Sequence, residues 1–160
     1  MPVKTSLKSR AIDEIDKKIL MILQDDGREQ LTSISKKVGL SIDSVHKRIK
    51  EMMRKDIVGI TTSIDPRKIG YDLIADNKIR LKNVSAEERT QFIRYLQQHN
   101  RVIDIFALMG DYDLTCVLIA KDSNELEKLI TEIRQKFRDL IDEWKSLLVL
   151  KTYKIDRYDL

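Results

Sequence analysis

The apolar residues in the first part of the chain recur at helical spacing. Over residues 12–23, isoleucine and leucine return every three or four positions, which predicts an amphipathic helix with Asp13 as its N-cap. The Asp26-Gly27 pair ends this pattern. A second, short helix is predicted to begin at Thr32, a good N-cap, and to stop at Gly39.

A third helix follows after a short turn. It begins after Ser41 as N-cap, and its apolar residues have the spacing of one buried helix face. This stripe consists of Val45, Ile49, Met52 and Met53. The β-branched run over residues 57–64, interrupted by Gly59, predicts a small hairpin or strand pair, here called the wing. Three short helices and a wing predict a winged helix-turn-helix domain over residues 12–64.

Proline and glycine mark the end of this domain. Residues 65–71 contain one of the two prolines of the chain and a glycine near their end, so we place the domain linker there. Residues 1–11 are polar and basic, which is typical of a flexible arm. Residues 72–160 are left for a second domain.

The pattern changes from helical to alternating in this second domain. Residues 73–82 alternate apolar and polar positions, as a half-buried strand does. Ser85 opens one helix with a capping box, and Asp122 caps another. Further strands are predicted over residues 102–109, 114–120 and 144–155. The order β-α-β-β-α-β predicts a C-terminal ferredoxin-like βαββαβ domain, and the whole chain is therefore expected to be α+β.

The sheet of this domain is predicted to need cover on both faces. The strands over residues 102–109 and 114–120 are apolar on both sides, and we expect them to be the two central strands. The two helices can cover only one face of a four-stranded sheet. A second copy of the sheet would cover the other face, so the sequence favours a homodimer.

Charge separates the two halves of the chain. Residues 1–70 hold 15 Lys and Arg against 10 Asp and Glu, a net charge of +5, whereas residues 71–160 hold 15 against 16, a net charge of −1. A local basic excess is typical of a part that binds a polyanion such as double-stranded DNA. The single Cys116 fits a cytoplasmic protein, and no apolar run is long enough to cross a membrane.

The third predicted helix is the candidate DNA-reading helix. Its polar face should point outward, and the first turns of such a helix reach base edges in the major groove. We therefore expect Ser44, His46 and Lys47 to contact bases. The other candidate DNA contacts, mostly to phosphates, are Ser33, Lys36, Ser41, Arg48, Lys50, Arg54, Lys55 and, in the arm, Lys4, Lys8 and Arg10. The alternative is an ordinary solvated basic face.

Several segments, in this order and at this spacing, resemble the Lrp/AsnC family of leucine- and asparagine-responsive regulators. They extend over about residues 12–155 of the chain. The matching segments are Ile15–Leu20, Asp26–Arg28, Ile34–Ser41, Val45–Ile49, Ile57–Ile60, Asp65–Tyr71 and Gly110–Leu114.

The resemblance implies an oligomer and a small-molecule effector. It implies dimers built back to back through the C-terminal sheets, often assembled into octamers. It also implies an amino-acid effector bound near the turn that consists here of Met109, Gly110, Asp111, Tyr112 and Asp113. Asp111 or Asp113 would suit an ammonium group, and backbone amides exposed beside glycine would suit a carboxylate. The alternative is a tight turn whose aspartates bond their own backbone.

The chain departs from the family at the entry to the wing. It has Lys55-Asp56 where the family usually has glycine, and a residue with positive φ would be strained there. It also has Ile60-Thr61 where the family often has an aromatic residue.

An enzyme is not expected. The sequence has no G-x-G-x-x-G, no P-loop and no plausible Ser/His/Asp set, and it suggests no cofactor and no metal site. Proteins similar to this family include haem-precursor decarboxylases, but His46 and His99 fall on a DNA face and at a helix end. A non-specific chromatin-organising protein and a bare sensor with a degenerate helix-turn-helix remain alternatives.

Overall fold

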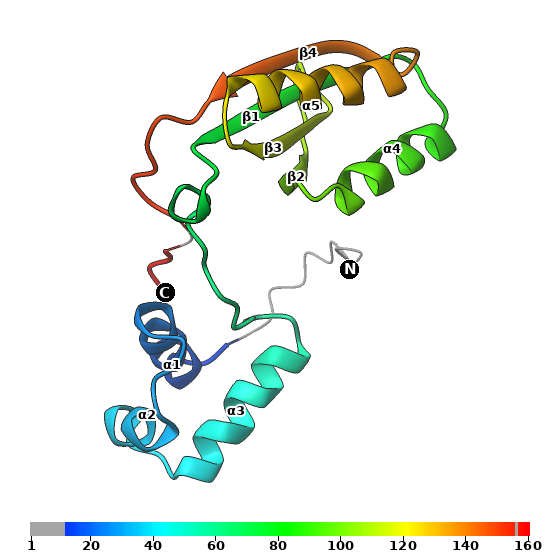
Figure 1. Cartoon of the computed structure of the whole chain (residues 1–160). Helices are drawn as coiled ribbons and strands as arrows, with labels where there is room; N and C mark the ends of the chain where they lie inside the picture. Colours follow the sequence, from blue (N-terminus) through cyan, green and yellow to red (C-terminus); the bar gives the residue numbers. More distant parts are fainter. Residues whose placement is uncertain (1–11, 156) are drawn as a thin grey trace. The chain divides into compact units, whose positions relative to one another are not determined.

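The computed structural model describes residues 12–155 and 157–160, which form two compact units (Figure 1). The first, here called the helical unit, extends to Ser63 and also includes the segment Lys154–Leu160. The second, here called the sheet unit, is Ile64–Tyr153. The predicted arm over residues 1–11 lies outside the described residues.

The helical unit has three helices. They are α1 (Glu14–Asp25), α2 (Leu31–Val38) and α3 (Ile42–Arg54). Asp13 caps α1 as predicted: its carboxylate accepts from the Asp16 N–H at 2.8 Å, and the Asp16 carboxylate accepts from the Asp13 N–H at 3.2 Å. The expected cap Thr32 is wrong. The carbonyl of Gln30 already accepts from Ser33 and Ile34, so α2 begins at Leu31.

One buried residue set holds these helices together. It contains Ile19, Leu20, Ile34, Val45, Ile49 and Met52, which come from all three helices. The sequence predicted this core through the periodicity of α1 and α3. The predicted wing is not present: residues 57–64 contain no strand. A two-stranded ribbon is only marginally stable by itself, and only Ile57 and Val58 at the start of this run pack against the helical core.

The sheet unit follows the predicted β-α-β-β-α-β order. Its elements are a short 3₁₀ helix η1 (Pro66–Ile69), β1 (Leu73–Leu81), α4 (Ala86–Gln98), β2 (Val102–Ala107), β3 (Leu114–Ala120), α5 (Ser123–Lys136) and β4 (Ile141–Leu148). The predicted caps Ser85 and Asp122 are confirmed, the first with a full capping box. The last strand ends at Leu148, earlier than the predicted residue 155.

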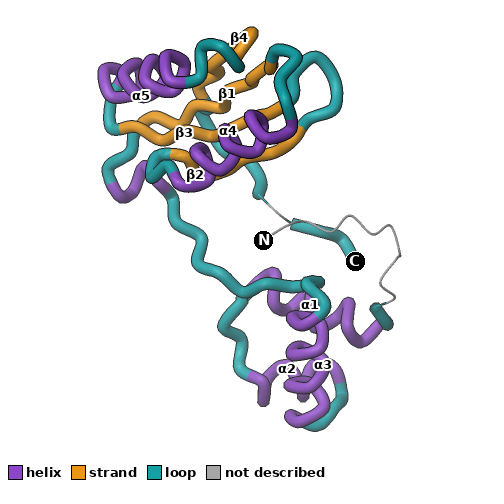
Figure 2. Tube along the Cα trace, turned by 90° about the vertical axis from the view of Figure 1, so that its right-hand side faces the viewer, coloured by secondary structure: helices purple, strands orange, loops and turns teal. Residues whose placement is uncertain are grey.

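The four strands form one antiparallel sheet in the order β2-β3-β1-β4. Both helices pack on one face, where Phe92 and Leu96 of α4 and Ile133 of α5 join the buried core (Figure 2). The centre of the sheet is β3 and β1, so the expectation that the strand over residues 102–109 is central was wrong. The charges of β1 are tolerated at the centre because Asp76 and Lys78 pair with each other at 2.9 Å.

The predicted linker is held by the sheet unit. The guanidinium of Arg67 donates to the carbonyl of Val149, and Arg101 donates to the Tyr71 hydroxyl at 2.7 Å. Arg101 also stands over the Tyr71 ring, 4.7 Å from its centroid. Residues 65–71 therefore have fixed structure within this unit.

Candidate functional site

A tight turn places α3 against α2. Gly39 ends α2 with φ +71°, a left-handed conformation that glycine adopts without strain. The N–H groups of Gly39 and Leu40 both donate to the carbonyl of Ser35, which closes the end of α2. Ser41 then caps α3 by accepting from the Ser44 N–H at 3.2 Å. The predicted glycine-leucine-serine turn is confirmed.

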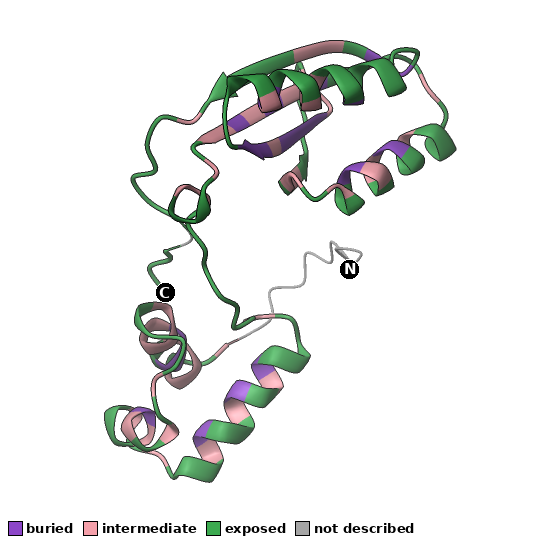
Figure 3. Ribbon diagram, in the orientation of Figure 1, coloured by how far each residue is buried: buried purple, intermediate pink, exposed green. Residues whose placement is uncertain are grey.

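The two sides of α3 differ sharply in exposure (Figure 3). Val45, Ile49 and Met52 are buried in the core of the helical unit. The opposite side is exposed and carries Asp43, His46, Lys47 and Lys50. In the part of the chain that the structure describes, no ion pair involves Lys47 or Lys50. The exposed side of α3 is thus a polar, cationic surface on a rigid support.

Arg48 has a different position from these lysines. Its Nη1 atom lies 2.7 Å from an oxygen of Asp13 and 2.8 Å from one of Asp16, at the start of α1. The hydrogen bonds that its guanidinium donates to Asp16 and Asp13 raise the pKa of Arg48 above its ordinary value. The guanidinium therefore joins α3 to α1. Sequence reasoning missed this link, because the partners are 32 and 35 positions away.

The end of α3 holds a second charged group. Arg54 contacts Glu51 at 2.6 Å, and Lys55 lies 3.1 Å from the same carboxylate. The Arg54 and Lys55 hydrogen bonds lower the pKa of Glu51 to about 2. Glu51 thus offsets part of the positive charge expected at this end.

The other predicted DNA contacts lie on α2 and at the cap of α3. Lys36 is exposed and Ser33 is half-buried on α2. The hydroxyl groups of Ser41 and Ser44 are 2.8 Å apart, so both take part in the cap. The predicted contacts Lys4, Lys8 and Arg10 lie outside the described residues.

The turn before β3 is the second candidate site. It is closed by the Leu108 N–H, which donates to the carbonyl of Asp113 at 2.8 Å, and Gly110 has φ +145°. Met109 is fully exposed, and Asp111 is exposed beside it.

The side chains of Asp113 and Tyr112 in this turn form hydrogen bonds with neighbouring strands. The carboxylate of Asp113 accepts from the Leu81 N–H at 2.8 Å. The Tyr112 hydroxyl donates to Glu143 at 2.9 Å, and this bond raises the pKa of Tyr112. Of the two candidate carboxylates for an ammonium group, Asp113 thus already has a structural partner, and Asp111 faces solvent.

Two further features are absent from the described part of the chain. Among residues 12–155 and 157–160, no group of three or more His, Cys, Asp or Glu side chains could hold a metal ion. Over the same residues, no helix has both the length and the apolar character that crossing a bilayer requires.

Each unit contains a segment that matches a known domain family. Residues 12–53 match the AsnC-type helix-turn-helix domain, and residues 77–159 match the Lrp/AsnC ligand binding domain. The chain belongs to the Lrp/AsnC family. This Lrp/AsnC protein therefore has an N-terminal DNA-binding domain and a C-terminal domain of the ligand-binding type, as the resemblance implied.

Its relatives in this family are transcription regulators. The chain is 32% identical over 150 residues to the HTH-type transcriptional regulator FL11 of Pyrococcus horikoshii, an alignment that covers 89% of this chain and 92% of the relative. It is 31% identical over 146 residues to the HTH-type transcriptional regulator Ptr1 of Methanocaldococcus jannaschii, covering 89% and 95%. These relatives support DNA-binding transcription regulation by this Lrp/AsnC protein.

Solved structures of the family share the fold. A transcriptional regulator of Neisseria meningitidis, solved in complex with L-methionine, superposes with a TM-score of 0.81 at 24% identity, over 91% of this chain and 94% of that one. AsnC of E. coli superposes with a TM-score of 0.80 at 23% identity, over 92% and 98%.

Proposed function

We propose that this protein binds specific DNA sequences as a dimer and responds to an amino acid bound at the turn Met109–Asp113. One observation carries the DNA part of the proposal. The exposed side of α3 presents His46, Lys47 and Lys50 on a helix whose opposite side is buried. A helix supported in this way can enter the major groove without rearranging its domain.

The position along α3 assigns different roles to these side chains. His46 and Lys47 lie in the first two turns, where a recognition helix reaches base edges, and Ser44 lies beside them. Lys50 and Arg54 lie further along and suit phosphates. Ser33 and Lys36 of α2 and Ser41, the N-cap of α3, suit phosphates as well. Arg48 acts in this proposal mainly by orienting α3, because its guanidinium already binds Asp13 and Asp16.

Competition between DNA ligands tests sequence specificity. We expect DNA selected from a random pool to compete about a thousandfold or more better than random DNA at the same salt concentration, which is the lower range for specific regulators. Equal competition by both DNAs would favour the chromatin-organising alternative instead. No binding to either would favour the bare sensor.

Dimerisation is proposed through the face of the sheet that carries no helix. Thr115, Val117 and Ile119 of β3 lie on this face, opposite the core residues of the same strand. Phe106 of β2 and Leu147 of β4 extend it and are 56% and 45% exposed. A second copy of the same face would bury the exposed side chains of Phe106 and Leu147.

The effector is proposed to be an amino acid. Asp111 has an exposed carboxylate for the ammonium group, and Gly110 leaves the adjacent backbone open to a carboxylate. The fold shared with the Neisseria meningitidis regulator solved with L-methionine supports this class of ligand. Titration calorimetry with a panel of amino acids tests it; heat from none of them at millimolar concentration would count against it.

A further inference from the structure

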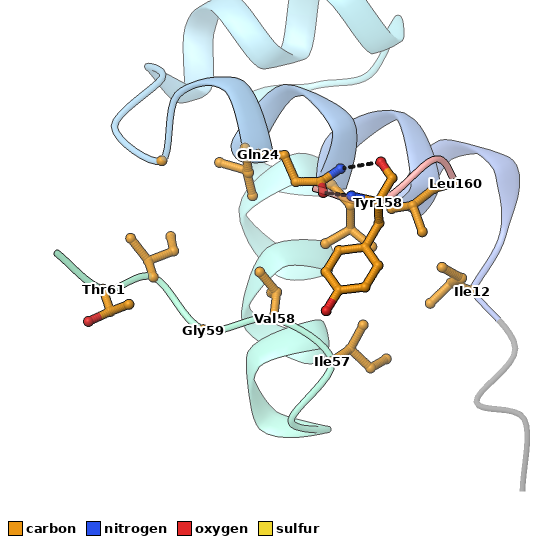
Figure 4. A pocket seen from close by; sticks show the side chains of 12 residues that line it. Ile12, Gln24, Ile57, Val58, Gly59, Thr61, Tyr158 and Leu160 are labelled. Carbon is orange, nitrogen blue, oxygen red and sulfur yellow. Dashed lines mark hydrogen bonds between the residues drawn. The ribbon is translucent and has the colours of Figure 1, made fainter. Parts of the chain in front are cut away.

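The helical unit contains an apolar groove beside α1. It is lined by residues of α1, among them Leu20, Leu23 and Gln24, by the non-helical run over residues 57–61, and by two residues near the C-terminus (Figure 4). Its volume is about 630 Å³. The run over residues 57–61 forms no strand along this side of α1.

A distant part of the sequence forms one wall of this groove. Tyr158 and Leu160 belong to the segment Lys154–Leu160, which packs with the helical unit although it follows the sheet unit in sequence. Figure 4 shows the Tyr158 ring beside Val58 and Ile57. The segment is here called the docking segment. It brings apolar side chains to a side of α1 that residues 57–61 alone do not cover.

Gln24 recognises the backbone of the docking segment. Its Oε1 atom accepts from the Tyr158 N–H at 2.7 Å, and its Nε2 atom donates to the Tyr158 carbonyl at 3.2 Å. These two bonds are the pair that one strand residue exchanges with its neighbour in an antiparallel ladder. Nε2 also donates to the sulfur of Met21 at 3.3 Å, which fixes the orientation of the amide.

An ion pair adds a second contact. Arg157 lies 2.7 Å from the carboxylate of Asp25, the residue after Gln24 on α1. Both groups are more than half exposed, so the pair contributes little energy, but it fixes the direction in which the segment runs along the helix.

We propose that the docking segment is an intramolecular ligand of the helical unit, and that Gln24 is the residue that binds it. The segment takes the place of the missing wing as a second layer beside α1, and with the run over residues 57–61 it encloses the groove. This site is separate from the exposed side of α3 and does not depend on the proposed DNA or effector contacts.

Amide hydrogen exchange in the full chain tests the proposal. Gln24→Ala should speed exchange of the Tyr158 N–H roughly fivefold to tenfold, the equilibrium change expected for one net hydrogen bond. Gln24→Glu keeps an acceptor for this N–H but cannot donate to the carbonyl, so its effect should be smaller. Lys18→Ala, at an exposed position of α1, is the matched control. Unchanged Tyr158 exchange in Gln24→Ala would overturn the proposal.

A mixing experiment tests whether the docking segment comes from the same chain. Isotope-labelled Gln24→Ala protein has an intact Tyr158, and unlabelled Tyr158→Pro protein has an intact Gln24. If docking is intramolecular, combining the two by unfolding and refolding leaves the labelled Tyr158 N–H in fast exchange. If mixing restores its protection, the segment docks on a second copy and the intramolecular assignment is wrong.

Discussion

A single backbone conformation determines how α3 ends. Asp56 has φ +54°, the one described residue other than glycine with a positive φ. Its N–H donates to Met53 and that of Ile57 donates to Met52, which is the pattern of a helix closed by a left-handed residue. The sequence pointed to this position, because the family usually has glycine there. Aspartate tolerates the conformation better than most side chains do.

Asp56→Gly should therefore stabilise the protein. Relief of the left-handed strain is expected to raise the free energy of unfolding by about 0.5–1 kcal/mol, partly offset by the greater entropy of an unfolded glycine. Asp56→Ala should do the opposite, since alanine has a Cβ and no polar group to bond locally. Urea unfolding of the three proteins measures both changes, and a loss of stability in Asp56→Gly would contradict the strain argument.

Acid unfolding should be sensitive to Glu51. Its pKa in the folded protein is about 2, below the ordinary value of 4.5, because Arg54 and Lys55 favour the charged form. The stability linked to Glu51 is therefore complete above pH 4.5 and is lost as the pH falls towards 2. Glu51→Gln should flatten this part of the pH profile, whereas Glu127→Gln on α5 should leave it unchanged. Parallel profiles for wild type and Glu51→Gln would contradict the assignment.

At the scale of elements, periodicity and caps predicted the helices well. The alternating pattern and β propensity predicted the partners of the strands poorly. Asp13, Ser41, Ser85 and Asp122 each bond within three residues, so the local sequence contains the whole signal. The run over residues 57–64 has β propensity, but a strand needs a neighbour, and propensity alone does not supply one. The position of a strand within the sheet likewise depends on crossover connections rather than on its own composition.

The turn before β3 illustrates the same limit for a site. The sequence identified Asp111 and Asp113 as equivalent candidates. The pairing of β1 with β3 decides between them, because it brings the Leu81 N–H to Asp113. No pattern within the turn reveals this contact.

Two substitutions separate the roles of these aspartates. Asp111→Asn should weaken amino-acid binding about tenfold or more through loss of a charge-assisted bond, with little effect on stability. Asp113→Asn should destabilise the fold by about 1–2 kcal/mol, since it weakens the bond to the Leu81 N–H. Calorimetry and urea unfolding on both variants check the pair of results. If Asp111→Asn binds as wild type does, the carboxylate assignment is wrong.

At the scale of the whole molecule, contacts between residues far apart in sequence determine parts of the fold that periodicity cannot predict. The sequence placed residues 72–160 in one domain, yet Lys154–Leu160 packs with the helical unit. Gln24 and Tyr158 are 134 positions apart, so no local pattern could connect them. The same holds for the link from Arg48 to the start of α1.

The proposed dimer through the helix-free face of the sheet predicts how a charge on that face changes the oligomeric state. Val117→Arg should place a charge in the centre of the proposed dimer interface and shift the molar mass in light scattering towards that of one chain. Arg94→Glu, at an exposed position of α4, should leave the mass as it is in the wild type. A stable dimer of Val117→Arg would locate the interface elsewhere.

The central claim is that the exposed side of α3 reads DNA sequence, and selection of binding sites from random DNA tests it most directly. We expect Lys47→Ala to lose preference at one or two base pairs in each half-site, at a cost of about 1–3 kcal/mol for the preferred sequence. Lys18→Ala should select the same sites as the wild type. An unchanged ranking of sites by Lys47→Ala and by His46→Ala would contradict the account.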